Sequence, residues 1–212
     1  VVKAPEHLEN ARAVALASGG LDSAVAAAVA MRECEAVTLL HARYGQRTWR
    51  KERACARKLA RHFGVEIVQI HLPHLAAFGG SCLTDETIPV PENALQDEGI
   101  PISYVPFRNA NLLAAAVSLA ECIGAGAVYI GAVEEDSSGY PDCRKGFFRS
   151  FARAIELGTR PETHVAIETP VIRLSKSGIV RLGVTLHVPF QLTWSCYQDE
   201  KRACGKCDSC LL

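Results

Sequence analysis

Short apolar runs alternate with longer amphipathic or alanine-rich segments along this 212-residue sequence, and this alternation limits its possible folds more than any other feature. Apolar runs bounded by glycine or polar residues are typical of buried strands, whereas a helical period of apolar side chains indicates a helix. Strands and helices in alternation form βαβ units, so the sequence predicts an α/β protein with a parallel five-stranded sheet flanked by helices. The predicted strands cover residues 13–17, 36–42, 65–71, 127–132 and 165–169, and the predicted helices cover residues 24–31, 49–63, 107–123, 146–157 and 175–182.

Charge and hydropathy exclude several classes of protein. Lysine plus arginine and aspartate plus glutamate each number 23, so the chain lacks the basic excess that grips nucleic acid non-specifically. No apolar run approaches the length of a membrane span, and residues 1–12 lack the apolar core of a signal peptide. We therefore expect a cytoplasmic protein that has neither nucleic acid nor a membrane as its partner.

Polar loops follow three of the predicted strands, at residues 18–23, 43–48 and 133–144. Ligands of parallel sheets bind at the carboxyl ends of strands, so we expect the site there. The first loop reads Ser-Gly-Gly-Leu-Asp-Ser; with Ala17 it is called here the phosphate loop (residues 17–23). Its glycines let a ligand approach the backbone, and the next helix offers unpaired N–H groups, so the loop is suited to phosphate or pyrophosphate. Asp22 would then hold Mg²⁺ or cap the helix; the alternative is a tight turn without a ligand.

Four of the nine cysteines gather near the end of the chain, in what we call the cysteine tail (residues 191–212). Cys204, Cys207 and Cys210 form two C-x-x-C steps, and Cys196 lies eight residues before the first of them. Four thiolates at this spacing suit a tetrahedral, structural Zn²⁺ site. The spacing leaves two alternatives open, an iron–sulfur cluster and a set of unrelated reduced thiols.

Several further strings, together with the phosphate loop and the cysteine tail, make nearly the whole chain similar to the 7-cyano-7-deazaguanine synthases. The phosphate loop by itself resembles that of the wider N-type (PP-loop) ATP pyrophosphatases. The resemblance implies a Rossmann-like, HUP-type fold with an ATP pyrophosphatase domain at residues 1–190 and a small C-terminal zinc-binding segment at residues 191–212. The matching strings lie at residues 44–47, 83–85, 104–109, 138–144, 168–170, 174–176, 192–197 and 204–210.

The resemblance also implies an activity. Members of this family are carbon–nitrogen ligases of queuosine biosynthesis that convert 7-carboxy-7-deazaguanine, ammonia and ATP into the nitrile preQ0, through an adenylated acid and an adenylated amide. A homodimer with one structural Zn²⁺ per chain, using ATP with Mg²⁺, is therefore expected. Two other functions stay open: another PP-loop adenylating enzyme such as a tRNA thiolase, and a nucleotide-binding protein without catalysis.

Transferred residue by residue, the resemblance assigns roles to four groups of side chains. The predicted catalytic residues are Asp22, Ser23, Arg108 and Lys176. The predicted ATP-binding residues are Ala17, Ser18, Gly19, Gly20, Leu21, Asp22, Ser23, Tyr44, Gln46, Arg108 and Gly131. The predicted substrate-binding residues are Tyr140, Asp142, Cys143 and Arg144, and the predicted metal ligands are Cys196, Cys204, Cys207 and Cys210. Arg43, Phe107 and Ser137 depart from the family pattern, which bears on pocket detail more than on the reaction class.

Overall fold

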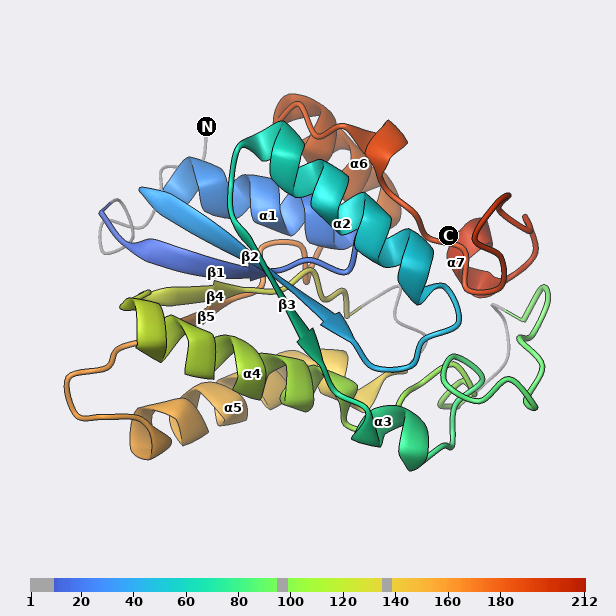
Figure 1. The fold of residues 1–212 in the computed structure, drawn as a ribbon, viewed down its shortest axis with the longest axis horizontal. Coiled ribbons are helices and arrows are strands. Elements are labelled where there is room, and N and C mark those ends of the chain that lie inside the picture. Colours follow the sequence, from blue (N-terminus) through green and yellow to red (C-terminus); the bar gives the residue numbers. More distant parts are fainter. Residues whose placement is uncertain (1–9, 95–98, 135–138) are drawn as a thin grey trace.

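A parallel sheet of five strands forms the centre of the molecule, in the order β3-β2-β1-β4-β5 (Figure 1). The structure, a computed structural model, describes residues 10–94, 99–134 and 139–212. The strands are β1 (Arg12–Leu16), β2 (Ala36–Arg43), β3 (Ile67–His71), β4 (Ala127–Tyr129) and β5 (Ala166–Glu168). All four neighbouring pairs are parallel, which confirms the predicted Rossmann-like α/β fold.

Helices cover both faces of this sheet (Figure 1). One face carries α1 (Leu21–Glu33), α2 (Trp49–Phe63) and α6 (Lys176–Thr185), and the other carries α4 (Arg108–Ile123) and α5 (Lys145–Gly158). The remaining helical segments are short: α3 (His74–Ala77), η1 (Pro141–Cys143), η2 (Phe190–Leu192) and α7 (Asp208–Leu211). None of the helices in the described ranges is long and apolar enough to cross a membrane.

The central strand β1 is apolar on both sides because both faces of the sheet are covered. Val14 and Leu16 belong to the core on the side of α4 and α5, whereas Ala13 and Ala15 belong to the core that includes α1 and α2. The alanines leave room for the alanine-rich α1 to pack closely on the sheet, and all four side chains are at most 6% exposed. Such strands read as continuous apolar runs, which is why the sequence revealed this one.

Most elements begin or end one to three residues from their predicted bounds, and two of these differences shape the site. Helix α1 begins at Leu21 rather than at residue 24, so Asp22 and Ser23 lie in its first turn. Strand β4 ends at Tyr129 rather than at residue 132, and Gly131 packs directly against the start of α1. The short helices α3, η1, η2 and α7 were not predicted, because segments of three or four residues carry too little periodicity to be recognised.

The chain changes direction across the sheet between β1 and β4. From β1 the sheet grows through β2 to β3 on one side, and through β4 to β5 on the other. The loops that follow the carboxyl ends of β1 and β4 therefore run in opposite directions and leave a crevice between them. Sheets of this type bind their ligands in that crevice.

Candidate active site

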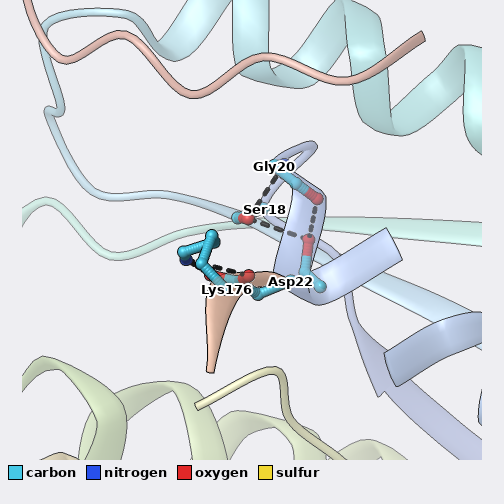
Figure 2. Close-up of polar contacts among 5 residues, drawn as sticks. Ser18, Gly20, Asp22 and Lys176 are labelled. Carbon is cyan, nitrogen blue, oxygen red and sulfur yellow. Dashed lines mark hydrogen bonds and ion pairs between the residues drawn. The ribbon is translucent and has the colours of Figure 1, made fainter. Parts of the chain in front are cut away.

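The phosphate loop holds its shape through hydrogen bonds among three of its own residues (Figure 2). The Gly20 amide donates to Ser18 Oγ at 3.1 Å, and Ser23 Oγ donates to the Gly20 carbonyl at 3.0 Å. The two hydroxyls lie 2.9 Å apart. Residue Gly20 is the N-cap of α1 and supplies no side chain to the helix, so the helix N-terminus is open to an anion.

Gly19 is required by both conformation and space. Its φ of +89° lies in the left-handed region that favours glycine, and a Cβ there would lie 2.4 Å from the Glu52 carbonyl oxygen in α2. The loop is thereby pressed against the backbone of α2. At the start of the loop, the Ala17 carbonyl accepts a hydrogen bond from His41 Nδ1 in β2 at 2.8 Å. This bond fixes the loop to the sheet.

Asp22 and Lys176 form an ion pair although they are 154 positions apart (Figure 2). Lys176 Nζ lies 3.1 and 3.0 Å from the two carboxylate oxygens of Asp22. Ser175 caps α6 by accepting from the Gly178 amide and so fixes where Lys176 begins the helix. The N-cap of α1 is Gly20, so Asp22 lies in the first turn of the helix, where its carboxylate meets the Lys176 ammonium.

A cavity of about 240 Å³, called here the first cavity, opens above the phosphate loop. It lies between the ends of β1 and β2 and collects side chains predicted from separate parts of the sequence. Of the predicted ATP-binding residues, only Gly19 is not part of its wall, since that residue packs against α2 instead. The predicted residues in the wall are Ala17, Ser18, Gly20, Leu21, Asp22, Ser23, Tyr44, Gln46, Arg108 and Gly131.

A buried network supports the far wall of the first cavity. Gln46 accepts from the Tyr44 amide at 2.8 Å and donates to Glu52 at 3.0 Å, and Thr48 Oγ1 donates to the same carboxyl at 2.7 Å. Burial raises the pKa of Glu52, and the donors Thr48 and Gln46 oppose that shift only in part. The sequence analysis missed Glu52, because one glutamate on an amphipathic helix resembles any solvent-facing charge.

Arg108 stands between the first cavity and a neighbouring one. Phe107 adopts a left-handed conformation just before α4, with φ 56°, and this turn sets the direction in which Arg108 enters the helix. The guanidinium lies 6.0 Å from the ring centre of Tyr44 and 5.9 Å from that of Tyr140. Arg108 Nη1 also donates to the Tyr44 hydroxyl at 3.5 Å, so a fixed cation faces both cavities.

The second cavity has a volume of about 170 Å³ and shares part of its wall with the first. Its own wall includes two predicted substrate-binding residues, Tyr140 and Cys143, and the predicted catalytic Lys176. Cys143 accepts from Asn109 Nδ2 at 3.3 Å, and the Tyr140 hydroxyl lies 2.8 Å from Ser103 Oγ. Both cavities contain Asp22, Arg108, Asn109, Ile130, Gly131, Tyr197 and Ser209 in their walls.

The other two predicted substrate-binding residues do not line either cavity. Asp142 is 2% exposed, and its Oδ2 accepts from the Asn109 amide at 2.8 Å, which anchors the start of α4. Its Oδ1 has no hydrogen-bond partner within the described ranges. Arg144 is exposed and is the N-cap of α5. Sequence alone could not separate these neighbours, because a tight turn sends adjacent side chains in different directions.

Of the three residues that depart from the family pattern, Arg43 and Phe107 line neither cavity and Ser137 lies outside the described residues. Arg43 stacks over the Trp49 ring at 4.0 Å, on the outer side of β2. Phe107 is 59% exposed, with its ring 6.2 Å from that of Phe147. Ser137 lies outside the described residues, as does Ser138 of the string at residues 138–144.

The four cysteines of the tail come together as one cluster, with all four Sγ atoms within 4.8 Å of one another. The Sγ atoms of Cys204 and Cys210 are 3.8 Å apart, which matches the separation of about 3.8 Å that tetrahedral Zn–S bonds near 2.3 Å require. Amides of Gln198 and Cys204 donate to Cys196 Sγ at 3.4 Å. Burial raises the pKa of Cys204, but amide donors outweigh it and lower that pKa to about 7. The donor set and its spacing therefore fit a metal ion.

The cysteine tail is also a wall of both cavities, which the sequence analysis did not foresee. Trp194 donates its amide to the Gly19 carbonyl at 2.9 Å and so joins the tail to the phosphate loop. Tyr197 and Ser209 line both cavities, and Asp208 lines the second. These residues lie within strings that the sequence analysis had noted at residues 192–197 and 204–210, so a signal existed without a role attached to it.

Curated relatives resemble the chain over nearly its whole length. A 7-cyano-7-deazaguanine synthase of Chlorobaculum tepidum is 56% identical over 200 residues, covering 94% of this chain and 88% of the relative. A 7-cyano-7-deazaguanine synthase of Chlorobium phaeobacteroides is 54% identical over 202 residues, covering 95% and 89%.

Solved structures and a protein family complete the comparison. The U34-tRNA thiolase NcsA from Methanococcus maripaludis (TM-score 0.54, 13% identity, 91% of this chain) and the NMN synthetase from Francisella tularensis (TM-score 0.50, 19% identity, 88%) share the fold. The chain spans 61% and 65% of those longer chains, less than two thirds of each. Residues 12–212 match the family described as queuosine biosynthesis protein QueC, and the chain belongs to that family.

Proposed function

We propose that this protein is a carbon–nitrogen ligase that converts 7-carboxy-7-deazaguanine, ammonia and ATP into 7-cyano-7-deazaguanine. A carboxylate is a poor electrophile at neutral pH, and its oxygen is a poor leaving group. Adenylation removes both obstacles, so the enzyme must bring a carboxylate to the α-phosphate of ATP. The relatives that carry the name of this activity support the proposal, as does family membership.

The observation that carries the proposal is the wall common to the two cavities. The phosphate loop lines only the first cavity along most of its length, whereas Tyr140 and Cys143 line only the second. Asp22, Arg108 and Gly131 lie where the two meet. ATP in the first cavity and a planar acid in the second would therefore have their reacting atoms beside a carboxylate and a guanidinium, the groups that phosphoryl chemistry requires.

Each step then has a defined partner in the chain. A carboxylate oxygen attacks the α-phosphorus, the bond to the β-phosphate oxygen breaks, and pyrophosphate leaves on the open amides of the phosphate loop with Ser18 and Ser23. Arg108 stabilises the charge on the phosphorus. Asp22 would hold Mg²⁺, with Lys176 released from its carboxylate towards the phosphates. Mg²⁺ bound there neutralises phosphate charge.

Nitrile formation then needs two further stages at the same carbon: formation of the primary amide and dehydration of that amide. Ammonia adds to the acyl carbon, AMP leaves, and one proton is lost, which gives the primary amide. The amide oxygen then attacks the α-phosphorus of a second ATP, and pyrophosphate leaves. Loss of AMP and two nitrogen-bound protons converts this adenylated amide, through its imidate form, into the nitrile. Both adenylations use the same contacts, so one phosphate loop serves the whole sequence.

Further properties of the molecule belong to the same proposal. One Zn²⁺ per chain would be held by Cys196, Cys204, Cys207 and Cys210 in a closed, structural site, since four thiolates leave no position for water. Residues 1–190 would form the ATP pyrophosphatase domain, and residues 191–212 the metal-binding segment. The active protein would be a cytoplasmic homodimer. Tyr140, Cys143, Asp142 and Arg144 would contribute to the acid-binding side.

One reaction mixture tests the proposal. Purified protein with ATP, Mg²⁺, ammonium and 7-carboxy-7-deazaguanine should yield the nitrile by mass spectrometry, with two AMP and two pyrophosphate per product. Omission of ammonium should stop the reaction before the amide. Binding of ATP without pyrophosphate release would indicate the non-catalytic alternative, and sulfur transfer to tRNA would indicate a thiolase. Metal analysis should give one zinc per chain, whereas iron with visible absorbance would refute zinc.

A further inference from the structure

The carboxylate of Asp208 lies in the wall of the second cavity, where no described residue pairs with it. No hydrogen bond or ion pair joins it to another residue in the part of the chain that the structure describes. Its Oδ1 is fully enclosed, although Asp208 itself is only partly buried. The two cations of this cavity are engaged elsewhere, because Lys176 is paired with Asp22 and Arg108 lies against Tyr44.

An unpaired, enclosed carboxylate oxygen is costly, so it indicates a ligand that supplies the missing donors. A buried polar atom without a hydrogen bond costs about 1–3 kcal/mol, and more when it is charged. Asp208 also lies between the metal-ligand candidates Cys207 and Cys210, and thiolates close by make an unpaired negative charge still less favourable. The backbone at Asp208 is fixed, because its carbonyl accepts from the Leu212 amide at 3.0 Å in α7.

The rest of the cavity wall indicates the shape of that ligand. Tyr140, Tyr197, Cys143 and Leu212 present apolar or aromatic surface around the same space. This surface suits a flat ring rather than a small ion, since aromatic and thiol groups offer little to a strongly hydrated cation. A carboxylate beside a flat ring accepts best from two parallel N–H groups on one edge.

We propose that Asp208 binds the amino-pyrimidinone edge of the substrate, with one oxygen accepting from the ring N1–H and the other from the 2-amino group. The inference rests on the proposed function and names the residue that selects the base. The carboxyl group of the substrate is attached to the five-membered ring, away from this edge. It would therefore face the other end of the cavity, whose wall includes Asp22, Lys176 and Arg108.

This assignment differs from the prediction from the sequence, in which the substrate-binding carboxylate is Asp142. Asp142 Oδ2 accepts from the Asn109 amide, and Asp142 is not part of the cavity wall. Asp208 lines the cavity, and neither of its carboxylate oxygens bonds to any of the described residues. The cysteine tail would then have two roles: it binds the metal, and the metal fixes the position of the residue that recognises the base. Ring recognition would depend on a segment more than 180 residues beyond the phosphate loop.

The test compares two acids that differ only in the 2-amino group, 7-carboxy-7-deazaguanine and 7-carboxy-7-deazahypoxanthine. Wild-type protein should prefer the amino-bearing acid by at least about 10²-fold in kcat/KM, because the analogue leaves a carboxylate oxygen unpaired. Asp208→Asn should lower kcat/KM for the amino-bearing acid by about 10²-fold and reduce the preference by at least about 10-fold. The KM for ammonium should stay unchanged. Asp199→Asn is the matched control: the new amide oxygen can still accept from the Lys201 amide, as Asp199 does at 2.6 Å, and the residue lines neither cavity.

Each outcome separates this inference from the proposed function. If wild-type protein makes no nitrile from 7-carboxy-7-deazaguanine, the proposed function fails. If it does make the nitrile, but wild type uses both acids equally or Asp208→Asn keeps the full preference, the inference fails alone. A rise in KM for ammonium only would assign Asp208 to the nitrogen donor and overturn it too. Metal content and thermal unfolding of Asp208→Asn check that the tail remains intact, and the wild-type preference can be measured without any variant.

Discussion

The phosphate loop and the cysteine tail both line the first cavity, but different forces give them their shapes. The loop is fixed by three hydrogen bonds among Ser18, Gly20 and Ser23, and by its packing on α2. The tail contains little regular structure, the end of η2 and the short helix α7, and its four sulfur atoms lie close enough to share an ion. One wall is therefore held by hydrogen bonds and helix packing, whereas we expect the other to depend on a metal ion that the four cysteines could hold.

This difference predicts how the two walls respond when the metal is removed or a residue is replaced. Loss of the metal should release Tyr197, Asp208 and Ser209 from the cavities and leave the phosphate loop largely in place. Among the described residues, one backbone hydrogen bond joins the two walls, from the Trp194 amide to the Gly19 carbonyl. Such a bond contributes about 1 kcal/mol, too little to carry the unfolding of the tail into the loop.

The largest expected effect concerns the loop wall and its cation. Asp22→Ala should lower nitrile formation by about 10³-fold, because a charged group at the reacting phosphate is removed and Lys176 loses its partner. Thermal unfolding should change little. Asp85→Ala is the control: Asp85 is partly buried, its side chain accepts from Thr87, and it lines neither cavity. Full activity of Asp22→Ala would remove Asp22 from the site.

The next effect tests whether the tail wall depends on the metal. Cys204→Ser should weaken metal binding by at least about 10²-fold and make residues 194–212 open to proteolysis. Binding of 7-carboxy-7-deazaguanine should be lost, whereas binding of inorganic pyrophosphate to the loop should be kept. Cys122→Ser replaces an exposed cysteine outside the cluster and should leave all three measurements unchanged. Equal loss of pyrophosphate and base binding would show that the walls are not independent.

A smaller effect probes how closely β4 approaches the phosphate loop. A Cβ at Gly131 would lie 2.6 Å from the Asp22 carbonyl carbon and 2.7 Å from the Ser23 amide nitrogen. Gly131→Ala should therefore lower the free energy of unfolding by about 1–3 kcal/mol and raise the KM for ATP. Gly146→Ala in α5 meets nothing within 4 Å and should leave the protein as stable or slightly more stable. Urea unfolding and ATP saturation curves compare the two, and an unchanged KM in Gly131→Ala would disprove the close approach.

The smallest effect concerns the support beneath the loop. Burial lowers the pKa of His41 below its ordinary 6.5, and the hydrogen bond to Ala17 opposes this only in part. The unfolded chain therefore takes up a proton below about pH 6.5 that the folded chain resists, so stability falls as pH falls through that range. His41→Gln should reduce the slope by up to about 1.4 kcal/mol per pH unit. Urea unfolding between pH 7.5 and 5.5 measures how the free energy of unfolding changes with pH. His62→Gln at an exposed position is the control. Identical slopes for wild type and His41→Gln would contradict the expectation.

The sequence alone determined the parallel sheet, the phosphate loop and the four-cysteine cluster. Each depends on spacing within a short segment: apolar runs for strands, two glycines beside serine and aspartate for the loop, and C-x-x-C steps for the cluster. Such features are local, because backbone geometry and thiol reach act over a few residues. The capping of α6 by Ser175 was predictable for the same reason.

Only the tertiary structure decided which of these pieces meet. It paired Asp22 with Lys176 across 154 positions, took Asp142 out of the cavity wall, and put Arg144 on the surface. It also made the cysteine tail part of the wall of both cavities, and it placed the Asp208 carboxylate there with no partner among the described residues. These arrangements follow from the packing of helices and the tail around the sheet, which sums many weak contacts between distant residues and leaves no local pattern in the chain.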